Sequence, residues 1–145
     1  MKFNHTKIMK NENYKRQDHE PPLAIEKWGW RYHHLGVPIN RPIQGEIYLS
    51  TYKVYVSGFE KCPFGIEWMR FEADSPVNKL VQSVPHLAFE VDDLDLELSR
   101  FNFGVITEPN SPGNEVRVAM IEHDGAIIEL IEFGKKNNYV YMLKG

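Results

Sequence analysis

An internal repeat is the feature that most constrains how this chain can fold. His33–Ile39 (HHLGVPI) aligns with Pro85–Val91 (PHLAFEV) at an offset of 52 residues, which matches His34 with His86. Two further blocks share one offset of 62 residues: YKVYVSGFE from Tyr52 aligns with NEVRVAMIE from Asn114, and GIEWMRF aligns with IIELIEF. The last block matches Glu67 with Glu129. Three blocks in the same order indicate a duplicated supersecondary unit.

Most of the repeated sequence is rich in β-branched and aromatic residues, which predicts strands. We expect strands over Tyr32–Ile39, Tyr52–Phe59, Gly65–Phe71, Pro85–Val91, Glu115–Glu122 and Ala126–Phe133. Asp92–Phe101 instead has apolar residues at helical spacing, which predicts one amphipathic helix with Asp92 or Asp93 as its cap. The turn residues of Thr107–Asn114 predict a loop, and His123–Asp124–Gly125 predicts a tight turn.

The two halves differ in length between their first and second blocks. The first half has only Asn40–Thr51 where the second has Asp92–Gly113, so we expect the first helix to be shortened or missing. The sheet of the first half would then expose Leu35, Val37 and Ile39, and exposed apolar patches are usually covered. We expect either Leu23–Trp30 or a second subunit to cover them, the latter in a homodimer.

The chain reads as a single domain over residues 23–145, with module one at 29–76 and module two at 81–134. Residues 1–22 are polar and predict a flexible arm. A net charge of −3 gives no reason to expect a nucleic-acid partner, and no apolar run is long enough to span a bilayer. A single cysteine allows no intrachain disulfide and fits a cytoplasmic location.

The matched histidines and glutamates are the candidate site. By strand alternation, His34 and His86 share a face with small residues, whereas Glu67 and Glu129 stand in otherwise apolar rows. A carboxylate buried in such a row must be paired or bound to a metal. Two imidazoles and two carboxylates suit one divalent ion, either Zn, Ni, Co, Mn or Fe. Around this site we expect a small-molecule pocket lined by Met69, Phe71, Glu90, Ile131 and Phe133.

The stretch from about Trp30 to Phe133 resembles the vicinal oxygen chelate superfamily, which includes glyoxalase I, methylmalonyl-CoA epimerase, extradiol dioxygenases and bleomycin or fosfomycin resistance proteins. The resemblance lies in HHLGVPI, GIEWMRF, HLAFEVDDLD and DGAIIELIEF. It implies an α+β fold in which two βαβββ modules form a concave mixed sheet around a central cup. It also implies metal ligands at His34, Glu67, His86 and Glu129, a pattern similar to glyoxalase I.

Several functions are compatible with this resemblance. The first is a glyoxalase-type lyase or isomerase, whose metal takes a substrate through two vicinal oxygens while Glu67 or Glu129 moves a proton to or from an enediolate-like intermediate. The second is an extradiol-type dioxygenase, which a fourth protein ligand would crowd. The third is a non-enzymatic resistance protein that sequesters a small molecule in the cup.

Overall fold

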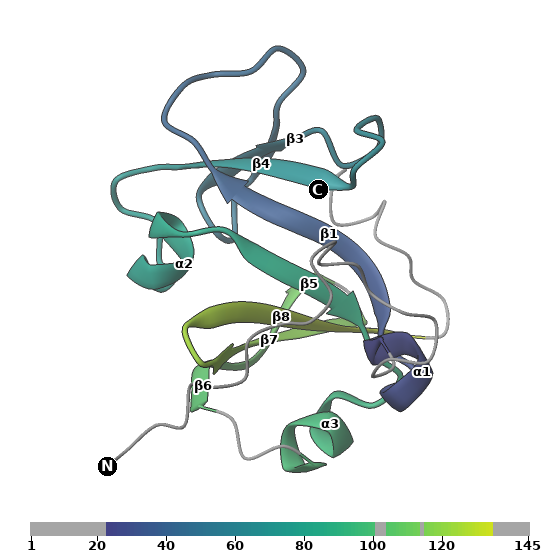
Figure 1. Cartoon of the computed structure of the whole chain (residues 1–145). Coiled ribbons are helices and arrows are strands. Elements are labelled where there is room, and N and C mark those ends of the chain that lie inside the picture. The colour runs from purple at the N-terminus through teal and green to yellow at the C-terminus, as the bar shows by residue number, and fades with distance from the viewer. Residues whose placement is uncertain (1–22, 101–103, 114, 135–145) are drawn as a thin grey trace, which may run out of the picture.

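The computed structural model describes residues 23–100, 104–113 and 115–134, so the predicted arm lies outside the described residues. The elements are α1 (Ala24–Trp28), β1 (Arg31–Pro38), β2 (Ile47–Leu49), β3 (Val54–Ser57), β4 (Ile66–Phe71), α2 (Lys79–Ser83), β5 (His86–Glu90), α3 (Leu94–Arg100), β6 (Gly104–Gly113), β7 (Val116–His123) and β8 (Ala126–Phe133) (Figure 1). None of these helices is long and apolar enough to cross a membrane.

The strands form one mixed sheet in the order β2-β3-β4-β1-β5-β8-β7-β6. The two halves are arranged alike, because β4 runs parallel to β1 and β8 runs parallel to β5. Antiparallel β1 and β5 join the halves at the centre, where Leu35 pairs with its repeat equivalent Leu87. This arrangement confirms the predicted α+β fold and the duplication.

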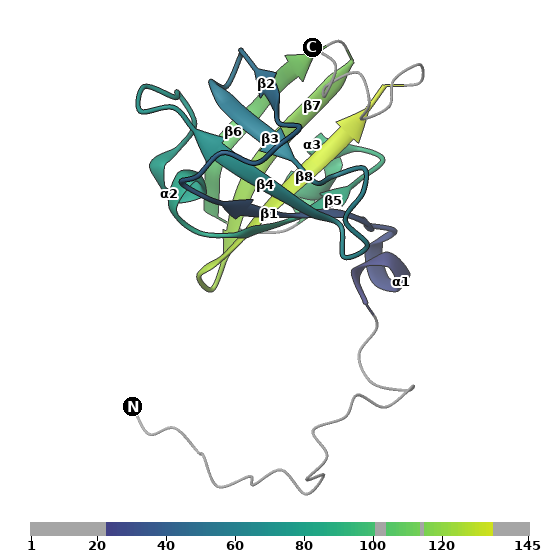
Figure 2. The ribbon, with the colours of Figure 1, turned by 90° about the horizontal axis from the view of Figure 1, so that it is seen from above.

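The sheet curls so that the outer strands of the two modules face each other. Seen from above, β2–β4 lie in front of β6–β8, and β1 and β5 run along one side and join the two groups (Figure 2). Apolar side chains of both modules cover the concave side: Val54 and Val56 pack with Met69 and Phe71, and Ala88 packs with Val116, Val118 and Ile131. The space between the modules is the predicted cup.

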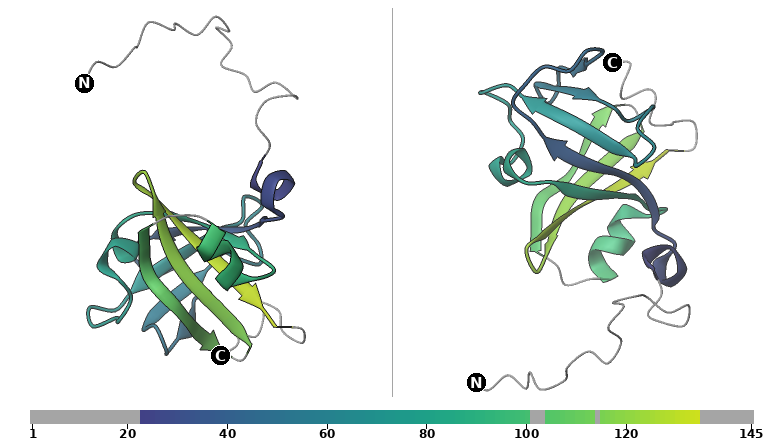
Figure 3. Two further views of the ribbon diagram at one scale, coloured as in Figure 1. Left: turned by 90° about the horizontal axis from the view of Figure 1, so that it is seen from below. Right: turned by 45° about the horizontal axis from the view of Figure 1, so that its top comes forward.

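The outer side of module two is covered by α3, as Figure 3 shows. Trp30 is buried there with Val91, Leu94 and Leu130, and its Nε1 donates to Glu97 Oε1 at 2.7 Å. The expectation that Leu23–Trp30 covers module one is therefore wrong. The segment is apolar as predicted, but α3 offers its two tryptophans a deeper apolar surface and a buried hydrogen-bond acceptor.

Module one has no helix between β1 and β2, as the shorter first half predicts. Its outer side is partly covered by the chain that connects these strands. Arg70 on β4 makes a bidentate ion pair with Glu46 of this connection, at 2.9 and 2.7 Å, and its guanidinium stacks 4.1 Å from the Tyr55 ring centre. Leu35 and Val37 remain half-buried.

One local prediction fails. Residues 107–113, predicted as a loop, belong to β6, an edge strand that pairs with β7 through repeated register shifts. Edge strands accommodate proline, which needs no ladder partner for its nitrogen. The α3 cap is Asp93, whose Oδ1 accepts from the Leu96 N–H, whereas Asp92 pairs with Arg31 at 2.9 Å. The Asp124–Gly125 turn forms as predicted, with both residues at positive φ.

Candidate metal centre

Sheet register brings the matched histidines and glutamates together on the concave face. Ala88 on β5 lies between His34 on β1 and Glu129 on β8, which gives one row of side chains across three strands. Gly36 on β1 lies likewise between Glu67 on β4 and His86 on β5. Each row therefore combines residues of both modules, with a small residue at its centre.

The small residues leave room for the imidazole rings. A Cβ atom on Gly36 would lie 2.1 Å from Cε1 of His86, so the His86 ring occupies the space that any larger residue would need. Ala88, the repeat equivalent of Gly36, is fully buried next to His34. The positions of both rings are thus set by the sequence of the neighbouring strand.

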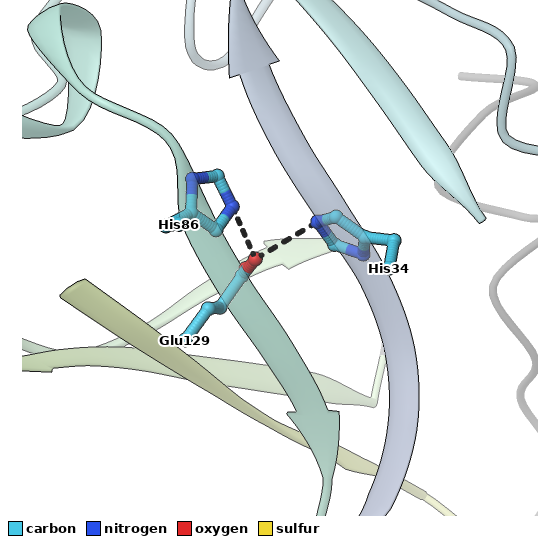
Figure 4. A group of neighbouring side chains, drawn as sticks. All are labelled: His34, His86 and Glu129. Carbon is cyan, nitrogen blue, oxygen red and sulfur yellow. Dashed lines mark ion pairs between the residues drawn. The ribbon is translucent and has the colours of Figure 1, made fainter. Parts of the chain in front are cut away.

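Three side chains converge at the floor of the cup: His34, His86 and Glu129 (Figure 4). Oε1 of Glu129 lies 3.3 Å from Nε2 of His34 and 3.2 Å from Nε2 of His86. The histidines are at most 2% exposed, and Glu129 is 9% exposed. Such complete burial of charge-bearing groups is costly unless something compensates it.

The geometry of this group fits a divalent metal ion. Two donor atoms each about 2.1 Å from one ion lie about 3.0 Å apart at a right angle and about 3.4 Å apart at a tetrahedral angle. The donor separations of 3.2 and 3.3 Å fall in this interval. Moreover, neither ring nitrogen of His86 makes a hydrogen bond of good geometry with the described residues. The group can therefore bind a metal, and its N/O donor set does not select a single ion.

Glu67 lies beside this group rather than at its centre. Its Oε1 is 3.5 Å from Nε2 of His34, and its side chain is almost fully buried. Oε1 of Glu129 contacts Nε2 of both histidines, and Oε1 of Glu67 pairs with His34. The two carboxylates are equivalent in the repeat but differ in their contacts.

The charges of the site reinforce one another. Burial alone would raise the pKa of the Glu129 carboxyl, but its interactions with His34 and His86 hold that pKa well below its usual range. Burial alone would lower the pKa of His34, yet Glu129 and Glu67 raise it overall. Glu129 therefore remains a carboxylate at neutral pH, the form that binds cations.

His33 is a further residue of the site, because its ring contacts that of His34. Tyr32 pairs with Phe89 and His34 with Ala88, so His33 is an extra residue in a β-bulge. Its Nδ1 lies 2.8 Å from Nδ1 of His34, and its ring stacks on Phe59. Burial and the neighbouring His34 charge lower the pKa of His33 to about 4, so the ring is neutral at neutral pH. Consecutive histidines at the start of a strand are the only sequence signal for this contact.

A cavity of about 550 Å³ opens above His34, Glu67 and Glu129. Its wall is largely apolar and includes Met69 and Phe71, two of the residues predicted for the pocket. The other three residues predicted for the pocket are not among its described lining residues. Ile131 is fully buried in the core, and Phe133 packs behind it. Glu90 pairs with Arg31 at 3.1 Å, because the bulge changes the alternation of β1 beside it.

The cavity also has uncharged polar groups. Tyr52 and Asn110, from opposite modules, both line it, and the Tyr52 hydroxyl donates to Asn110 Oδ1. Thr51, Thr107 and Ser111 lie in the same lining. The lining residues that the structure describes include no lysine or arginine. An occupant would meet apolar walls, a few uncharged polar groups and the histidine–carboxylate floor.

No protein-family model matches this sequence, and a search of curated proteins finds no significant match. Among solved structures, a hypothetical protein from Bacillus halodurans C-125 is similar at 16% identity and a TM-score of 0.51, covering 75% of this chain and 98% of that one. Methylmalonyl-CoA epimerase from Mycobacterium tuberculosis is similar at 18% identity and a TM-score of 0.50, covering 73% of this chain and 89% of that one. These likenesses show that the chain shares its fold with methylmalonyl-CoA epimerase, a member of the superfamily that the sequence resembles.

Proposed function

We propose that this protein is a metal-dependent lyase or isomerase of the glyoxalase type, acting on a small substrate with two vicinal oxygens through an enediolate-like intermediate. The observation that carries the proposal is the convergence of His34, His86 and Glu129, of which His34 and Glu129 line a cavity of about 550 Å³. The similarity in fold to methylmalonyl-CoA epimerase supports an isomerase in particular.

The protein would hold one divalent ion with His34, His86 and Glu129, and with Glu67 as the fourth ligand. A bound ion would supply Lewis-acid stabilisation of the negative charge that develops on the substrate oxygens. The apolar wall of the cavity would bind the body of the substrate and exclude water from the reacting carbon.

Glu67 is the better candidate for the proton-transferring base. Oε1 of Glu129 contacts both histidines at the centre of the group, and Glu67 lies beside that group, 3.5 Å from His34, in the lining of the cavity that would hold the substrate. A carboxylate that takes a proton from the substrate must be able to move toward it. Glu67 would remove the proton adjacent to the substrate carbonyl and return it to the neighbouring carbon or to the same carbon.

Metal titration of the purified protein tests the site. We expect one equivalent of zinc, cobalt or nickel to bind, and His86→Ala to abolish this binding. Stoichiometric metal that survives His86→Ala would refute the site, and no metal under any loading condition would favour a sequestering protein instead.

A second experiment tests the reaction. The metal-loaded protein is incubated in D2O with hemithioacetals, α-hydroxy ketones and malonyl-type thioesters, and proton NMR follows exchange at the carbon next to the carbonyl. We expect Glu67→Gln to retain the metal but to slow exchange by at least about 100-fold, in the range of a lost general base. Oxygen uptake with catechols by the iron-loaded protein would favour the dioxygenase alternative.

A further inference from the structure

The two histidines of the site are equivalent in the repeat but are held in different ways. Nδ1 of His34 lies within hydrogen-bonding distance of His33, at 2.8 Å. His86 follows Pro85, whose side chain has no hydrogen-bonding group, and the Nδ1 of His86 has no hydrogen-bond partner among the described residues. The His86 ring is placed by its packing over Gly36.

We propose that His33 is a positioning residue that fixes the ring orientation and tautomer of His34, so that Nε2 of His34 is available as a metal donor. This inference rests on the proposed metal site. Two ring nitrogens 2.8 Å apart need a proton between them. When Nε2 of His34 donates its lone pair to a cation, Nδ1 must carry that proton and donate it to Nδ1 of His33. Partners of this kind orient metal-binding histidines and strengthen their donor nitrogen.

His33 is itself held firmly enough for this role. Its ring stacks on Phe59 at a centroid distance of 4.8 Å and an interplanar angle of 25°, and Phe133 lies 5.7 Å away. The bulge is what turns its side chain toward His34, because regular alternation would direct consecutive residues to opposite faces. The two consecutive histidines and the bulge thus act together: the bulge places the ring of His33 against that of His34.

The variant His33→Phe tests the proposal, because phenylalanine keeps the aromatic stack and removes the nitrogen. We expect its zinc affinity, measured by competition with a chromogenic chelator, to be about 10–100-fold weaker than that of the parent. Tyr32→Phe is the matched control: it alters the other neighbour of the bulge, an exposed residue that contacts backbone carbonyls of 64 and 65. We expect this control to bind zinc within about twofold of the parent.

A second readout does not depend on metal. In protein labelled with ¹⁵N-histidine, we expect a nitrogen–nitrogen coupling between His33 and His34 across the hydrogen bond, in both the metal-free and the zinc-loaded parent. His33→Phe binding zinc as tightly as the parent, or absence of the coupling, would overturn the proposal. If the parent binds no zinc, the proposed function fails, and the coupling alone decides the role of His33.

Discussion

Gly36 determines where the His86 ring can lie, because any side chain at position 36 would occupy the space of that ring. A methyl group added there would overlap Cε1 of His86, which is buried and cannot rotate into solvent. Strand β1 thus contributes to the site because Gly36 has no side chain and leaves room for the His86 ring. The equivalent position in the other row, Ala88, tolerates one methyl group beside His34.

Gly36→Ala should therefore weaken metal binding without unfolding the chain. We expect zinc affinity to fall at least about tenfold, because the ring must shift away from Glu129. Gly104→Ala is the control, since a methyl group there meets no atom of the described residues within 4 Å. An unchanged zinc affinity in Gly36→Ala would show that His86 does not lie over Gly36.

For single residues of the site, the internal repeat is a better predictor than the alternation of side chains along a strand. Equivalence of the two halves is enough to bring His34, His86 and Glu129 together, because a pseudo-twofold arrangement acts on matched positions. Strand alternation fails at His33 and Glu90, because a bulge adds one residue to β1 and shifts every face assignment on its far side. Nothing in a local sequence pattern marks that extra residue.

Among the elements, the short N-terminal stretch around α1 ties β1 to the helix of the other module. Trp30 is buried among α3, β7 and β8, and its indole nitrogen satisfies the buried Glu97 carboxylate. The stretch closes the hydrophobic layer between α3 and the sheet. Its stabilising effect is therefore on module two, although it precedes module one in sequence.

Trp30→Ala should lower the free energy of unfolding by about 3–5 kcal/mol, since it removes a large buried side chain and the hydrogen bond to Glu97. Urea unfolding followed by far-UV circular dichroism measures the change. Leu23→Ala, at an exposed position of the same stretch, should change it by less than about 0.5 kcal/mol. Equal effects of the two substitutions would contradict the packing described for Trp30.

Element type was predictable where periodicity is strong, as in α3 and β8, and not where turn residues dominate. Pro109, Pro112 and Gly113 predict a loop, but β6 lies at the sheet edge and needs only β7 as a partner. The sequence likewise did not indicate on which module Leu23–Trp30 packs. Its apolar character predicts that it docks but does not choose between two modules.

For the molecule as a whole, bound metal should stabilise the fold, because the donors come from three strands of both modules. Zinc at about 100 times its dissociation constant adds about 2.7 kcal/mol to the free energy of unfolding. For a chain of this length, that raises Tm by about 5–10 °C. Differential scanning fluorimetry with and without zinc measures the shift. In His86→Ala we expect no zinc-dependent shift, and an equal shift in parent and variant would place the ion elsewhere.

The join between β1 and β5 has a consequence for how copies of this chain can assemble. Leu35 of β1 pairs with its repeat equivalent Leu87 of β5, so the two strands make equivalent contacts across the join. A module one that paired with the module two of another molecule would use the same contacts across residues 31–36 and 86–90. Each composite would again contain one histidine and one glutamate from each side. If two chains exchanged halves in this way, each half would again meet the same set of metal-binding side chains.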